Sequence, residues 1–84
     1  MEARTYNRRR EALINERAEF YLTLNRSYKE TKEHAEGKVA HFEKEAEELY
    51  DTFKKKLTNR KETEWLYTLE AMIRGAKAYL QELA

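Results

Sequence analysis

The chain contains no proline and only two glycines among its 84 residues. These are the residue types that most disfavour a helix, whereas Glu, Lys, Arg, Ala and Leu, which favour it, are abundant. Charged residues make up 39% of the chain, and its six tyrosines, three phenylalanines and one tryptophan are more than a disordered chain would carry. The composition therefore predicts one all-α domain spanning residues 1–84.

Two short polar segments divide the chain. In the first, Asn25 tolerates the left-handed conformation that ends many helices, and Ser27 with Glu30 matches a capping box. In the second, Asn59 and Glu62 repeat the cap pattern after a run of lysines that suits a helix C-terminus. We therefore expect an antiparallel three-helix bundle with helices near residues 3–24, 28–57 and 60–83.

The second and third predicted helices differ in their apolar patterns. The second carries a narrow seam of the coiled-coil kind, which Gly37 interrupts at a point where the helix could kink. The third carries a broad apolar face and, behind it, a stripe of small residues: Thr68, Ala71, Gly75 and Ala78. A helix that is apolar or small on most sides is buried on most sides. The third helix is therefore either the middle of the bundle or part of an oligomer interface that uses this stripe.

The predicted helix lengths favour self-association. At 1.5 Å per residue the second helix is about 45 Å long and the first about 33 Å. A monomer would leave about one to two turns of the longer helix without support, unless Gly37 bends it. Oligomerisation also commonly supplements a core as small as this one. We therefore expect a dimer or a higher oligomer.

Two arginines depart from the pattern of the first predicted helix. Arg10 and Arg17 fall within its apolar stripe, where a guanidinium must pair with a carboxylate or extend to water. Antiparallel pairing would bring Arg17 near Glu33 and Glu36 of the second helix, and Arg10 near Glu43. The alternative is that one or both contact an anionic ligand or a partner's carboxylates, which suit the planar fork of arginine.

Positive charge gathers where three segments would meet at one pole of an up-down-up bundle. The cations of this pole are Arg4, Arg8, Arg9, Arg10, Lys54, Lys55, Lys56, Arg60 and Lys61. They outnumber the nearby carboxylates in a chain whose net charge is only +1. The pole is either a solvated surface or a docking site for phosphates or an acidic protein. No nucleic-acid motif is present, so we expect no sequence-specific binding of nucleic acid.

Other functions lack the residues that they need. There is no cysteine, which excludes disulfides and thiol chemistry. His34 and His41 each lie four residues from a glutamate and could offer a metal two ligands, but solvent-exposed histidines are the simpler interpretation. No glycine-rich phosphate loop or nucleophile–base pair is present, so we expect neither enzymatic activity nor a cofactor. With no signal peptide and no apolar run near the ~20 residues of a membrane span, a cytoplasmic location without membrane contact is the expectation.

One part of the chain is similar to a known family. The residues concerned are Ala46-Glu-Glu-Leu, Asn59-Arg-Lys-Glu-Thr, Leu66, Leu69-Glu70 and Ala76-Lys-Ala78. They resemble the helical hairpin of small phage proteins that sequester cyclic nucleotides from CBASS immunity, over less than half of the chain. Arg74-Gly75-Ala76 stands where that family has a tryptophan-containing stretch, and its N-terminal tyrosine-containing segment is missing. The resemblance implies a phosphate-bearing ligand.

Two functions of different classes follow from these patterns. Tyrosine is enriched at protein interfaces, which favours a non-enzymatic interaction module, of adaptor or inhibitor type, that self-associates. It would bind its partner through Tyr6, Arg8, Arg9, Arg10, Arg17 and Tyr21 of the first helix. The alternative is a binder of nucleotide or phosphate at the basic pole, through Lys54, Lys55, Lys56 and Arg60. A designed helical bundle is a further alternative, although the two arginines in the apolar stripe depart from an idealised pattern.

Overall fold

The structure is a computed structural model that describes residues 3–55 and 59–84, with the side chains of all of these except residues 3, 4 and 6. It contains three helices, α1 (Ala3–Ser27), α2 (Lys32–Lys54) and α3 (Arg60–Leu83), and the described residues form no strand. The predicted all-α class and three-helix bundle are confirmed. Within the same residues, no helix combines the length and the apolarity that a membrane span requires.

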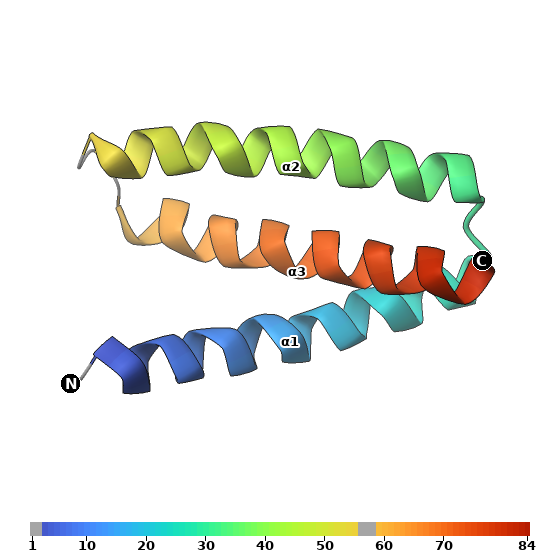
Figure 1. Ribbon diagram of the computed structural model, residues 1–84, viewed down its shortest axis with the longest axis horizontal. Helices are drawn as coiled ribbons and strands as arrows, with labels where there is room; N and C mark the ends of the chain where they lie inside the picture. The colour runs from blue at the N-terminus through green and yellow to red at the C-terminus, as the bar shows by residue number, and fades with distance from the viewer. Residues whose placement is uncertain (1–2, 56–58) are drawn as a thin grey trace.

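The last helix lies in the middle of the molecule. Figure 1 shows α3 between α1 and α2, with α1 running parallel to it and α2 antiparallel. α3 contacts both neighbours, whereas the backbones of α1 and α2 do not contact each other along the described ranges. The helices therefore form an open layer of 39 × 25 × 19 Å instead of a closed triangle. Of the two positions left open for the third helix, the central one is correct.

The turn between α1 and α2 is built differently from the prediction. Lys29 takes the left-handed conformation, with φ 51°. The N–H of Glu30 donates to the carbonyl of Asn25 and the N–H of Lys29 to that of Arg26, both at 3.2 Å, which is a Schellman motif. The prediction that Asn25 ends the helix and Ser27 begins the next was wrong. Both lie in the last turns of α1.

The starts of the other two helices are capped by side chains. Thr31 caps α2 by accepting a hydrogen bond from the N–H of His34 at 3.2 Å. Asn59 caps α3 as predicted, because its side chain accepts from the N–H of Glu62 at 3.0 Å. The α2 helix continues through Gly37 without a break and ends at Lys54, short of the predicted residue 57, while residues 56–58 lie outside the described residues. With 25 residues in α1 and 23 in α2, the overhang that favoured an oligomer does not exist.

The contact between α2 and α3 is built from large apolar side chains. Ala46, Leu66 and Leu69 are buried there, and Leu69 has no exposed surface. The partly buried residues packed around them are Phe42, Leu49, Phe53, Met72 and Ile73. This is the seam predicted for the second helix, and it accounts for the broad apolar side of α3.

The contact between α1 and α3 depends on small residues instead. A Cβ atom on Gly75 would lie 2.9 Å from both the carbonyl oxygen of Ala18 and the Cβ of Tyr21, so the two backbones approach each other closely there. Ala71 beside it has no exposed surface. The small-residue stripe predicted as an oligomer interface thus faces α1 of the same chain at Gly75, and Ala78 packs against a cluster of Leu22, Ala35 and Tyr79.

Candidate protein-interaction face

The two arginines of the apolar stripe pair with α3. Arg17 donates to a carboxylate oxygen of Glu64 at 2.9 Å and to the hydroxyl of Thr68 at 3.3 Å. Arg10 donates to the carboxylate of Glu70 at 3.3 Å. The predicted pairing with Glu33, Glu36 and Glu43 of α2 was wrong because α3 separates α1 from α2. The interpretation as ion pairs within the bundle is correct in kind, with different carboxylates.

Glu70 is the centre of a polar network. Its side chain is only 11% exposed and accepts hydrogen bonds from Arg10 and from the hydroxyl of Tyr50. Arg10 also lies over the ring of Tyr67, with 5.7 Å between the guanidinium carbon and the ring centroid. Partial burial, and then the hydrogen bond to Glu70, raise the pKa of Tyr50 to about 12. One side of the layer therefore joins all three helices through a single carboxylate.

Further ion pairs lie on the same side of α3 or at its edges. Arg74 donates to both carboxylate oxygens of Glu11, at 2.8 and 3.1 Å, and to Asn15 at 2.9 Å. Lys77 pairs with Glu43 at 3.5 Å. The hydrogen bonds from Arg74 lower the pKa of Glu11. We call this surface, formed by Glu11, Tyr50, Glu70, Arg74 and Lys77, the polar face.

The opposite face of the layer is apolar. Met72 is two residues from both Glu70 and Arg74, about 200° around the helix, so it points away from the polar face. A hollow of about 210 Å³ lies beside it, lined by Tyr21, Leu24, Asn25, Tyr28, Lys38, Phe42, Met72 and Ala76. All three segments of the fold contribute to this hollow. It lies where α1 and α2 converge near the turn that joins them.

Two shallower depressions continue this hollow along α3. The first shares Tyr21 with it and is lined by Leu13, Glu16, Arg17, Phe20, Tyr21 and Thr68. The second shares Thr68 with the first and is lined by Arg60, Lys61, Glu64, Trp65 and Thr68. We call this surface the apolar face and define it by its apolar and aromatic residues: Phe20, Tyr21, Leu24, Tyr28, Phe42, Trp65, Met72 and Ala76. Between Tyr21 and Trp65 it is crossed by the ion pair of Arg17 with Glu64.

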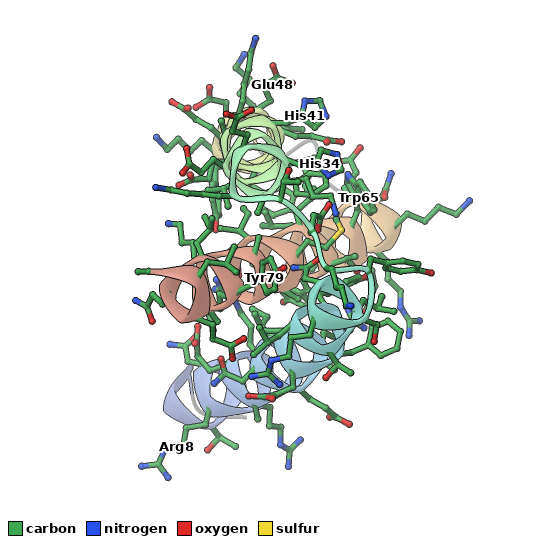
Figure 2. The ribbon with its side chains drawn as sticks, turned by 90° about the vertical axis from the view of Figure 1, so that its right-hand side faces the viewer. Arg8, His34, His41, Glu48, Trp65 and Tyr79 are labelled. Carbon is green, nitrogen blue, oxygen red and sulfur yellow. The ribbon has the colours of Figure 1, made fainter. Side chains whose placement is uncertain are left out.

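The aromatic side chains of the apolar face are poorly covered. Phe20 is 60% exposed, Tyr28 79% and Trp65 42%. Phe20 makes one edge contact with Tyr21, with 5.5 Å between the ring centroids. The indole N–H of Trp65 donates to Glu45 at 3.0 Å, which holds the ring beside α2. In Figure 2, Trp65 lies on the same side of the layer as His34 and His41.

The predicted basic pole is only partly assembled. The cations at the end of α2 and the start of α3 are exposed and share one end of the molecule: Lys54, Lys55, Arg60 and Lys61. The start of α1 diverges from α3 at this end (Figure 1), and the exposed Arg8 points away from the layer (Figure 2). Arg9 is exposed too. The side chain of Tyr6 and the whole of Lys56 lie outside the described residues.

Each of the two histidines lies beside a glutamate. The Nδ1 atom of His34 is 2.5 Å from Glu30, which also binds Lys38 at 2.6 Å, and His41 lies 3.9 Å from Glu45. Both histidines are exposed. Among the described residues, no group of three or more His, Asp or Glu side chains is placed to hold a metal ion.

Comparisons with protein families, curated proteins and solved structures find no match for this chain. The resemblance to cyclic-nucleotide-sequestering phage proteins therefore stays a hypothesis. Of the predicted site residues, Tyr21 lies on the apolar face, and Arg60 lines its outer depression. Phe20, Trp65 and Met72 belong to the apolar stripes of their helices, a pattern that is also typical of core residues. Because α2 fills the broad apolar side of α3 and α1 covers its small residues, the sequence carries no signal that distinguishes the exposed Trp65 from a core residue.

Proposed function

We propose that this chain is a non-enzymatic interaction module whose apolar face binds the helical surface of a protein. The observation that supports the proposal is the group of three aromatic side chains on the apolar face, which are between 42% and 79% exposed. Single exposed apolar residues are common on monomers, but a contiguous patch rimmed by polar groups is typical of an interaction site.

The distribution of charge supports the same face. The charged groups of the polar face form ion pairs within the subunit, and Arg10 and Arg17 also pair with carboxylates of α3. A partner that broke these ion pairs would have to supply new partners for the charged groups. Covering Phe20 and Tyr28 instead removes apolar surface from water, which stabilises a complex by about 25 cal/mol per Å² buried. The proposed contacts are thus Phe20 of α1, Tyr28 of the turn after it, and Trp65 of α3, in place of the predicted Arg10 and Arg17.

Site-specific photocrosslinking in the source organism tests the proposal. Benzoylphenylalanine replaces Tyr28 on the apolar face in one variant and Glu48, on the outer side of α2 (Figure 2), in the control. We expect a protein adduct at position 28 and none at position 48. Equal labelling at both positions, or none at position 28, would contradict the proposal.

A second candidate is an anionic ligand at the outer depression. Arg60 and Lys61 lie there beside Trp65, so that cations and an exposed indole border one surface. Cations that bind phosphate next to an aromatic ring that stacks on a base are a recurrent nucleotide-binding combination. A melting temperature raised by nucleotides or cyclic dinucleotides, and no longer raised in Arg60→Ala/Lys61→Ala, would support it. An unchanged melting temperature across such a panel would exclude it.

A further inference from the structure

We infer that the occupant of the apolar face is a second copy of this chain, packed face to face with its helices antiparallel. The inference rests on the proposed function, since it names the partner of the same face.

The shape of the apolar face is self-complementary. Near the turn between α1 and α2 the face is recessed, at the hollow of about 210 Å³. At the other end, the start of α3 lies toward this side of the layer and carries the exposed Trp65, as Figure 2 shows along the helices. A two-fold axis across α3, near residues 69 and 70, would bring Trp65 of each copy over the hollow of the other. A cavity of about 150 Å³ holds a benzene molecule, so the hollow has room for an aromatic ring.

Charge selects the antiparallel arrangement. Lys54, Lys55, Arg60 and Lys61 gather at one end of the layer. At the other end Lys38 is paired with Glu30, and Arg26 with Glu82. Parallel packing would place the two cationic ends together, whereas antiparallel packing separates them and opposes the dipoles of the two α3 helices.

The area of the face matches what a dimer needs. Aromatic side chains bury about 150–250 Å² each, so Phe20, Tyr28 and Trp65 at their observed exposures offer roughly 300–400 Å². A standard interface buries about 800 Å² per partner, of which about 56–58% is apolar. The layer is 39 × 25 Å in its two longer dimensions, which is large enough for such a contact. These three side chains would supply most of the apolar share.

Sedimentation equilibrium on two matched variants tests the inference. Phe20→Ser/Tyr28→Ser changes the apolar face, and Tyr50→Ser, a 41% exposed tyrosine on the polar face, is the control. We expect a dimer for the 10.2 kDa chain and for the control, and at least a tenfold weaker dimer for the double variant. Circular dichroism checks that each variant is helical. A wild type that stays monomeric at millimolar concentration overturns the inference, as does a dimer that the double variant leaves unchanged.

The orientation is tested separately, because the chain has no cysteine of its own. Lys61→Cys and Lys38→Cys, at opposite ends of the face, are mixed and oxidised. Antiparallel packing predicts the mixed disulfide in excess over either self-disulfide, and an excess of the two self-disulfides overturns it. If the chain is monomeric but position 28 still forms a photoadduct with another protein, the proposed function holds and only the inference of a second copy is wrong.

Discussion

The two faces of the layer differ in whether their side chains find partners within the subunit. On the polar face, Glu70 and Arg74 bind side chains of neighbouring helices, so its charged groups find partners within the subunit. On the apolar face, Phe20 and Tyr28 leave most of their rings in solvent. An open layer of three helices has two outer faces. Within one subunit, the charged groups of the polar face find partners, whereas the aromatic side chains of the apolar face stay exposed to solvent.

The difference between the two faces depends on the central position of α3. Leu69→Ala tests this position and should cause the largest loss of stability among the proposed variants. Leu69 is fully buried between α2 and α3, so we expect the free energy of unfolding to fall by about 2–5 kcal/mol. Leu83→Ala, at a 46% exposed position of the same helix, is the control and should cost below about 1 kcal/mol. Urea denaturation measures both. Equal losses would mean that α3 is not packed as described.

A pair of glycine substitutions tests the close contact of α1 with α3. In Gly75→Ala the new Cβ would lie 2.9 Å from the backbone of Ala18, and the overpacking should outweigh the gain in helix propensity and destabilise by about 1–2 kcal/mol. Gly37→Ala meets no atom within 4 Å and should stabilise by about 0.5–1 kcal/mol. Thermal melts of both variants and of the wild type measure these changes in stability. Stabilisation by both would show that the two helices do not approach closely.

The polar face is tested by Glu70→Gln. The amide removes the negative charge that Arg10 faces at a nearly buried position, so we expect a loss of about 1–2 kcal/mol in stability. Glu43→Gln, in the exposed pair with Lys77, is the matched control and should cost below about 0.5 kcal/mol. Because neither residue lies on the apolar face, the sedimentation behaviour of both variants should equal that of the wild type.

The smallest expected effect concerns alkaline pH. The pKa of Tyr50 is raised to about 12, so the folded chain keeps this proton at a pH where the unfolded chain, with a pKa near 10, has lost it. Its contribution to stability is present below about pH 10 and is lost as the pH rises toward 12. In Tyr50→Phe, the ultraviolet titration should lack its highest phase and the stability should fall less over this range. An unchanged titration would contradict the contact with Glu70.

The sequence predicts the helices better than their arrangement. The absence of proline and the Asn59 cap are local properties, and they indicate the three helices and the start of α3 correctly. The left-handed Lys29 escaped prediction because lysine has no preference for that conformation and adopts it here within the hydrogen bonds of the Schellman motif.

The candidate site was harder to predict for a related reason. An arginine in an apolar stripe indicates an ion pair but not its partner, which depends on which helix is central. A stripe of small residues suits any close helix contact, within one chain or between two, so the position of Gly75 against α1 could not be derived from spacing. Tyr21, predicted as a partner contact, lines the hollow, and its role there stays a prediction.

Isotope-filtered nuclear Overhauser spectroscopy on a mixture of labelled and unlabelled chains tests the central claim most directly. The single tryptophan, Trp65, and Met72 are two turns apart on α3, about 10 Å along the helix, and the isotope filter records only contacts between copies. We expect cross-peaks between the indole ring of one copy and the Met72 methyl group of the other. A dimer whose intermolecular cross-peaks connect the polar faces, or a spectrum without any, would contradict it.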